Sequence, residues 1–233
     1  MEQQLAANIS IKERIKTIFE KAKPYLLKGI FSFLISRLII TNGISPFSQA
    51  FLLSTGNNYF ILLTSLLGII SNNKLNQYKY ILMLLFSSVV QTFITLTFPG
   101  IKKDKSAPFI LFFSSFIFGL IFVIFTDYVI FDILLVILES FISSVFFFIC
   151  KNFLWFLENK PVKRYFTYEE LTAPLIVFCI IISGIGNIPL PFNLALKNIC
   201  CIYIILTASI YANLGTTAQI AVFMGIAAGL GND

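Results

Sequence analysis

The stretch that organises this chain is Lys151 to Glu170, KNFLWFLENKPVKRYFTYEE, a long polar segment between two blocks of apolar sequence. Its basic side chains are Lys151, Lys160, Lys163 and Arg164. Loops that carry an excess of Lys and Arg beside membrane spans are retained in the cytoplasm. The stretch therefore predicts a basic cytoplasmic loop over residues 151–170, between a first membrane block over 25–150 and a second over 171–233.

Within this loop, Pro161 predicts the end of any helix, because proline supplies no N–H and its ring clashes with the preceding turn. Before it, Asn152 to Glu158 is predicted to form a short helix at the membrane interface, with Phe153 and Trp155 in the headgroup zone, where aromatic residues are favoured. An ordinary amphipathic connector packed on protein is the alternative.

The composition excludes a soluble globular protein. Of the 233 residues, 58% are hydrophobic and 12% are charged, against about 25% charged in typical globular domains, and the mean hydropathy is +0.89. The net charge of +6 comes from basic residues beside apolar runs, which indicates membrane orientation rather than nucleic-acid binding. We therefore predict an all-α polytopic membrane helix bundle whose partner is the lipid bilayer, with no nucleic-acid partner.

The N-terminal segment over 1–24 is predicted to lie in the cytoplasm. From Asn8 to Lys23, apolar residues recur at helical spacing opposite Lys and Arg, which is typical of an amphipathic helix on a membrane surface, and Pro24 is expected to end it. No small-residue cleavage site follows the next apolar run, so the segment is not interpreted as a signal peptide.

The apolar runs predict about eight or nine membrane segments: 25–40, 44–54, 59–70, 78–98, 108–126, 129–150, 171–185, 199–212 and 219–230. The segment 44–54 is too short to cross about 30 Å of hydrocarbon, so 44–70 is either one kinked span or a hairpin of two short helices. Only the hairpin places the N-terminus, the basic loop and the cluster Lys102, Lys103 and Lys105 on one cytoplasmic side, so it is preferred. The last segment stops after about twelve residues, less than a span needs, and we expect the chain to be a fragment or a truncation of a longer protein.

Arg37 and Glu139 are the charged residues predicted inside spans, and such residues are candidate functional sites because an unpaired charge in hydrocarbon is costly. Arg37 is about 6 Å from a span end and can extend to the interface, whereas Glu139 is about 15 Å from either end of its span. Glu139 is expected to be protonated, to pair with Arg37, or to line an aqueous path.

Small residues recur at Ala221, Gly225 and Gly229, which includes a GxxxG pattern that lets two helices approach closely. Packing within the chain is the first interpretation, and self-association of two chains is the alternative.

No motif of catalysis or metal binding is present. The sequence has no histidine, and its four cysteines lie in or beside apolar segments without zinc spacing. Walker, GxSxG and HExxH patterns are also absent. We expect no cofactor, no metal and no enzyme activity in this chain.

Three stretches together resemble the membrane domain of stage II sporulation protein E. They are FLISRLIITNGISPFSQAF at 33–51, Leu138-Glu139-Ser140 before an apolar run, and 168–231, with EEL at its start and SGIGNI at the end of its first span. The resemblance implies about ten spans that carry a middle region engaging the tubulin-like division protein, followed by a Mn- or Mg-dependent Ser/Thr phosphatase.

In that family, the phosphatase dephosphorylates an anti-anti-sigma factor and so activates the forespore sigma factor at the polar septum. The resemblance thus implies a bacterial membrane-anchoring and assembly domain that self-associates and engages cell-division and sporulation proteins at the septum. Arg37 and Glu139 would be structural or assembly residues. The alternative is a small secondary transporter, or a substrate-binding membrane subunit of one, because short interrupted helices occur in such proteins.

Overall fold

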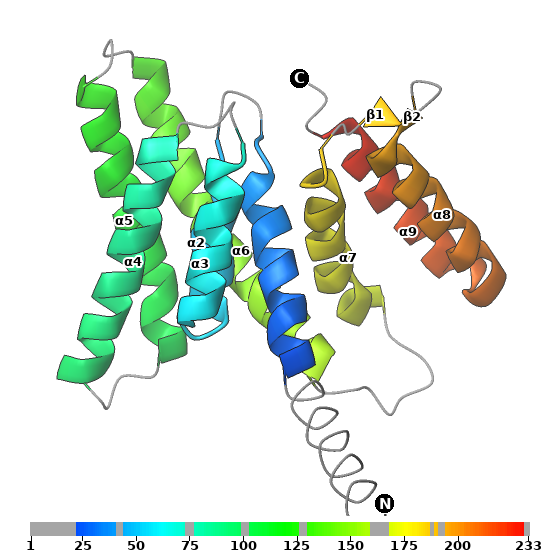
Figure 1. The fold of residues 1–233 in the computed structure, drawn as a ribbon, viewed down its shortest axis with the longest axis horizontal. Coiled ribbons are helices and arrows are strands. Elements are labelled where there is room, and N and C mark those ends of the chain that lie inside the picture. Colours follow the sequence, from blue (N-terminus) through cyan, green and yellow to red (C-terminus); the bar gives the residue numbers. More distant parts are fainter. Residues whose placement is uncertain are drawn as a thin grey trace, which may run out of the picture.

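The computed structural model describes residues 22–40, 44–72, 77–98, 103–125, 130–158, 168–186, 189–190 and 194–230. A first helix over 22–37 precedes α2 (Phe47–Ser54), α3 (Tyr59–Ile70), α4 (Gln77–Thr97), α5 (Lys103–Phe125), α6 (Ile130–Glu158), α7 (Tyr168–Ser183), α8 (Leu196–Tyr211) and α9 (Leu214–Gly229) (Figure 1). Extended pairing in these residues is confined to the two-residue strands β1 (Pro189–Leu190) and β2 (Leu194–Ala195) and a bridge between Ile40 and Ile44. The prediction of an all-α bundle is confirmed.

The outer surface of the bundle is apolar. Of the described helices, α4, α5 and α6 are long and apolar enough to cross a membrane, while α3, α7, α8 and α9 are shorter apolar helices. Large apolar side chains point outward, for example Phe93 at 63% exposure and Phe125 at 85%. Contiguous exposed apolar surface on this scale fits lipid rather than water, so the chain is a multi-pass membrane protein.

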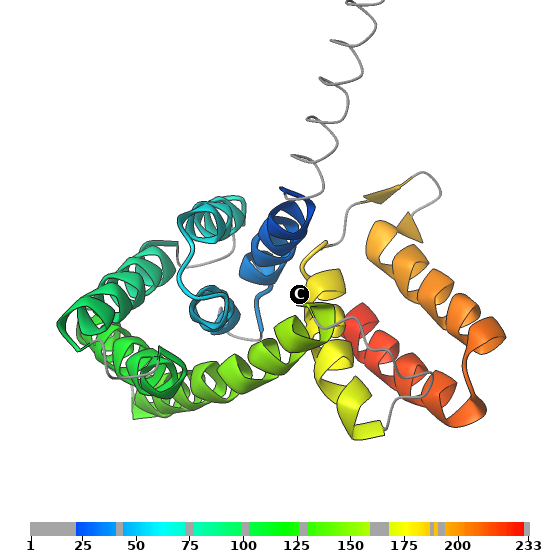
Figure 2. The same ribbon diagram turned by 90° about the horizontal axis from the view of Figure 1, so that it is seen from below.

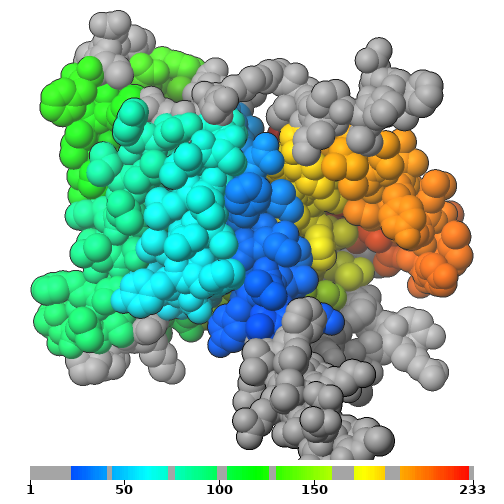
Figure 3. All heavy atoms as spheres, viewed as in Figure 1, coloured from blue at the N-terminus to red at the C-terminus, as the bar shows by residue number. Residues whose placement is uncertain are grey.

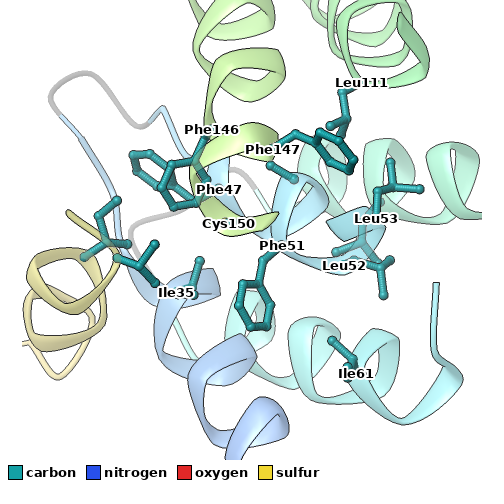
Figure 4. Packing of buried hydrophobic residues seen from close by; sticks show 14 of the residues in the cluster. Ile35, Phe47, Phe51, Leu52, Leu53, Ile61, Leu111, Phe146, Phe147 and Cys150 are labelled. Carbon is teal, nitrogen blue, oxygen red and sulfur yellow. The ribbon is translucent and has the colours of Figure 1, made fainter. Parts of the chain in front are cut away.

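The short segment α2 lies inside the bundle and forms a hairpin with α3, as predicted. Every residue from Phe47 to Leu53 is buried, and Figure 4 shows Phe51 and Leu52 among side chains of α3, α6 and the first helix. The two helices are joined by Gly56 and Asn57, both with positive φ, and Asn58 caps α3 by accepting a bond from the Phe60 N–H.

The hairpin turn is hydrogen-bonded to a neighbouring helix. Polar groups at membrane depth need such partners, because no water is available there. The Asn57 side-chain amide donates to the Ser88 carbonyl and to Thr92 Oγ1, each at 2.9 Å. In return, Ser88 Oγ donates to Asn57 Oδ1 at 2.7 Å. The tip of the hairpin is therefore attached to α4 by three hydrogen bonds.

The basic parts of the chain meet at one edge of the bundle. Figure 1 shows the start of the first helix, the end of α4, the start of α5 and the end of α6 at the same end. Lys28 pairs with Glu158 at 2.6 Å, and Lys151 pairs with Asp104. We call this end, with Lys28, Asp104, Lys105, Lys151 and Glu158, the basic edge. It also contains Lys103, the first residue of α5, whereas Lys102, Lys160, Lys163 and Arg164 lie outside the described residues.

Two glycines, one in α3 and one just after α7, allow the chain to pack closely against both sides of the first helix. A Cβ at Gly68 of α3 would lie 2.5 Å from the Phe33 carbonyl oxygen, and one at Gly184, just after α7, would overlap the Leu34 carbonyl. Figure 3 shows the first helix, in blue, between α3 and α7 on one face of the molecule. These close contacts place backbone against backbone, which only glycine permits.

The buried apolar residues form two clusters. The larger lies among the first helix and α2–α7, and the smaller contains Cys179, Ile182, Cys201, Met224 and Ala227 of α7, α8 and α9. Figure 2 shows α7, α8 and α9 as a group beside the first helix and α2–α6.

The prediction of a separate interfacial helix at 152–158 is wrong. Helix α6 runs without interruption from Ile130 to Glu158, and Phe153 is fully buried. Its ring lies 5.7 Å from that of Phe31 and 5.5 Å from that of Phe178. These aromatic contacts continue the core to the basic edge, while Trp155 is 62% exposed.

Three predicted boundaries also need correction. Residues 22 and 23 are helical and continuous with Pro24, so no helix ends at this proline; the amphipathic helix over 8–23 otherwise lies outside the described residues. The helix of the first span ends at residue 37, and residues 38–40 are not helical. The turn before the last helix is at Ala212 and Asn213, and α9 begins at Leu214.

Candidate functional site

The most polar buried site surrounds Glu139 of α6. Its Oε2 accepts from Lys79 Nζ at 2.5 Å, and its Oε1 accepts from the Tyr80 hydroxyl at 2.6 Å. The Tyr80 oxygen in turn accepts from the Ser45 N–H at 3.0 Å. Ser45, Tyr80 and Glu139 are each at most 1% exposed. We call these four residues the Glu139 network.

Three members lie at or just before a helix start, and Glu139 lies within α6. Lys79 and Tyr80 belong to the first turn of α4, with Tyr80 directed into the bundle and the Lys79 side chain 12% exposed. Ser45 precedes Pro46, the residue before α2, where the backbone N–H has no helical partner. The network therefore connects the start of α2, the start of α4 and the body of α6.

The geometry favours a structural role for the carboxylate. Burying a carboxylate costs several kcal/mol unless partners compensate it. Here both oxygens of Glu139 are bound by side chains of α4, one of them cationic. A carboxylate that carries a transported ion must exchange its partners. Here the two bonds of the carboxylate belong to a network that holds the start of α2, the start of α4 and the body of α6 together.

Arg37 does not join this network. Its guanidinium carbon lies 5.8 Å from the centre of the Phe33 ring, and its Nε is buried without a hydrogen-bond partner among the residues that the structure describes. Its carbonyl oxygen accepts from the Asn72 amide at 2.5 Å, which joins the end of the first helix to the end of α3. The pairing of Arg37 with Glu139, one of the three alternatives for this carboxylate, is not formed, because the carboxylate faces Lys79 and Tyr80 of α4.

The depth estimated for Glu139 also changes. In the structure α6 has 29 residues, of which Glu139 is the tenth. It is therefore about 14 Å from the start of the helix and about 29 Å from its end. Glu139 lies level with the first turn of α4, and this proximity brings Lys79 within reach.

Sequence reasoning missed Lys79, although it falls at the start of the predicted span 78–98. A lysine at a span end is commonly assigned to the interface, because its long side chain can reach water. The adjacent tyrosine was the usable signal, since a Lys-Tyr pair in a first helical turn offers two donors to one buried carboxylate.

A second polar group lies around α2. Gln49 is fully buried, and its Oε1 lies 3.4 Å from Ser114 Oγ and from Ser115 Oγ of α5. Buried side-chain oxygens without a partner in the described chain are those of Ser45, Ser48, Gln91, Ser143 and Gln219. No three His, Cys, Asp or Glu side chains of the described residues gather as a metal site would require.

The glycines of the GxxxG pattern face outward. A Cβ at Gly225 or at Gly229 would meet no described atom within 4 Å. The buried residues of α9 are instead Met224 and Ala227, and Ala221 is half-buried. Packing of these two glycines against another described helix is thus not observed, and self-association through this face stays a prediction.

The chain was compared with known proteins. The model of the family described as SpoIIE, N-terminal domain, matches residues 2–232. No curated protein and no solved structure matches the chain. Because the match covers nearly the whole sequence, this chain belongs to the SpoIIE N-terminal domain family.

Proposed function

We propose that this chain is the membrane-anchoring and assembly domain of a SpoIIE-type sporulation phosphatase and has no catalytic activity of its own. The observation that carries the proposal is the family match over residues 2–232. In the resembled full-length protein, a Mn- or Mg-dependent phosphatase domain follows the membrane domain and acts on an anti-anti-sigma factor at the polar septum.

The geometry supports anchoring rather than transport. The basic edge collects the start of the first helix, the start of α5 and the end of α6, which fits a cytoplasmic face. The buried carboxylate has both oxygens bound by α4. The proposed domain is therefore multi-pass and oriented with its N-terminus in the cytoplasm.

The orientation is tested by cysteine labelling at positions 5 and 162 in sealed vesicles. Both positions are expected to react from the cytoplasmic side only. Labelling of the two positions from opposite faces would contradict the topology.

The location is tested with a fluorescent protein fused after residue 233 in sporulating cells. Enrichment at the polar septum is expected, with the same reporter on an unrelated multi-pass protein as control. A uniform membrane signal equal to that control would contradict septal assembly.

One observation favours the transporter alternative. Helix α2 is a short buried helix inside the bundle, and interrupted elements of this kind form the binding sites of secondary transporters. The reading frame distinguishes the two functions. Continuation through another span into an Asp-rich soluble domain supports the anchor, while a stop codon after Asp233 beside an ATPase gene supports the transporter.

A further inference from the structure

A groove between α4 and α5 begins at the basic edge and runs toward the middle of the bundle. Its volume is about 520 Å³, within the range of small-molecule sites. Its walls are apolar, with Phe86, Val90 and Ile94 from α4 and Phe109 and Phe113 from α5. Lys105 lies at the end that opens on the basic edge.

The mouth of this groove carries an uncompensated positive charge. Lys105 is exposed and is in none of the ion pairs among the described residues. The neighbouring carboxylate, Asp104, is paired with Lys151 of α6. An apolar groove that ends at a lysine on a membrane edge is complementary to a molecule with a hydrocarbon chain and an anionic head.

The groove has the depth of one lipid leaflet. Its α5 wall extends from Lys105 to Ile117, which is about 18 Å along a helix. Half of a hydrocarbon core about 30 Å thick is about 15 Å. A chain that entered beside Lys105 would therefore end near the middle of the membrane, as the chains of a lipid in that leaflet do.

Contacts at both ends fix the walls. Near the mouth, α5 is attached to α6, because Ser144 Oγ donates to the Pro108 carbonyl at 2.9 Å and Lys151 pairs with Asp104. At the inner end, α4 and α5 meet through the rings of Phe86 and Phe118, whose centres are 4.9 Å apart. The groove is thus formed by the fold itself before any ligand enters.

We propose that this groove binds one anionic phospholipid from the leaflet at the basic edge. One acyl chain lies against Phe86, Val90, Ile94, Phe109 and Phe113, and the phosphate contacts Lys105. The bound lipid fills the space between α4 and α5 and makes the domain sensitive to the anionic lipid content of its membrane.

The test measures lipid binding to the purified chain by native mass spectrometry, with phosphatidylglycerol and phosphatidylcholine added separately. One phosphatidylglycerol is expected to bind more tightly than phosphatidylcholine. Lys105→Gln should lower the affinity for phosphatidylglycerol about five-fold, the factor expected for one lysine near an anionic surface. The affinity for phosphatidylcholine should fall less, because its choline compensates the charge of the phosphate. The matched control is Lys23→Gln, which removes an exposed lysine of the first helix.

A second variant tests the acyl-chain site. Val90→Trp places a large ring in the groove and should abolish binding of both lipids, whereas Val89→Trp, at a neighbouring position 65% exposed on the outer surface, should not. Equal binding of the two lipids to the unaltered chain, or Val90→Trp binding lipid as well as Val89→Trp, would overturn the proposal. If Val90→Trp does not fold, Lys105→Gln decides alone, and an unchanged phosphatidylglycerol affinity overturns the proposal.

Discussion

The first helix with α2–α6 and the group α7–α9 are held together in different ways. The first region has a large buried cluster and directional contacts between its helices, including the Glu139 network and the bonds of Asn57 to α4. The second has a small cluster and, among its described residues, fewer such contacts, for example Lys197 Nζ donating to the Leu230 carbonyl at 2.7 Å. Between membrane helices, apolar contact alone gains little over contact with lipid. The first region is thus specified by polar bonds, while both regions leave large apolar faces exposed.

The largest effect is expected from breaking the polar bonds of the first region. Lys79→Ala leaves the buried Glu139 carboxylate without its cation, and loss of one partner of a buried pair costs about 3–5 kcal/mol. SDS titration of the detergent-solubilised chain measures the change in unfolding free energy. The control is Lys23→Ala, at an exposed position, and a cost no greater than that of this control would contradict the role of the pair. Adding Glu139→Gln to Lys79→Ala should restore part of the loss, because it removes the unpaired charge.

The next largest effect is expected where the two regions meet. Gly184→Ala places a methyl group against the Leu34 carbonyl, and this backbone atom cannot move without shifting the first helix. Overpacking of this kind costs about 1–3 kcal/mol, measured by the same titration. Gly225→Ala serves as control, because its Cβ meets no described atom within 4 Å. A loss of stability in Gly225→Ala equal to that in Gly184→Ala would show that space at residue 184 is not the cause.

The architecture could be predicted from the sequence because it depends on features that are local in the chain. Apolar runs indicated the helices, and the clusters at 102–105 and 151–164 selected the hairpin at 44–70, which α2 and α3 confirm. Charge near span ends fixes the side on which a loop lies. No knowledge of side-chain packing was needed for that step.

The partners of Glu139 could not be predicted in the same way. They depend on the rotation and depth of α4 against α6, and an error of one helical turn, about 5.4 Å, changes which side chains meet. The glycines show the same limit. The GxxxG pattern indicated α9, yet the glycines in close backbone contact are Gly68 and Gly184, each outside that pattern. A motif identifies small residues but not the face that meets a neighbour.

Two double-mutant cycles test whether Glu139 is coupled to Lys79 or to Arg37. Lys79→Ala with Glu139→Gln should be strongly non-additive, by about 0.5–3 kcal/mol, because the two side chains are in contact. Arg37→Gln with Glu139→Gln should be additive within about 0.5 kcal/mol, since Arg37 lies over Phe33 instead. The unfolding free energies of the single and double variants provide both couplings. Coupling between Arg37 and Glu139 as large as that between Lys79 and Glu139 would contradict the observed pairing.

The smallest effect on stability is expected on the exposed face of α9. Gly225→Leu adds a side chain where no described atom lies within 4 Å, so the unfolding free energy of the monomer should fall by no more than about 0.5 kcal/mol. If two copies associate through this face, the same change should lower energy transfer between labelled chains in vesicles, because close helix approach needs small residues. Val222→Leu, at a position of 63% exposure on the same helix, is the matched control. A monomer destabilised by more than 1 kcal/mol, a limit well above the ordinary surface range, would mean that Gly225 packs within its own chain, and the contrast between the two regions would disappear.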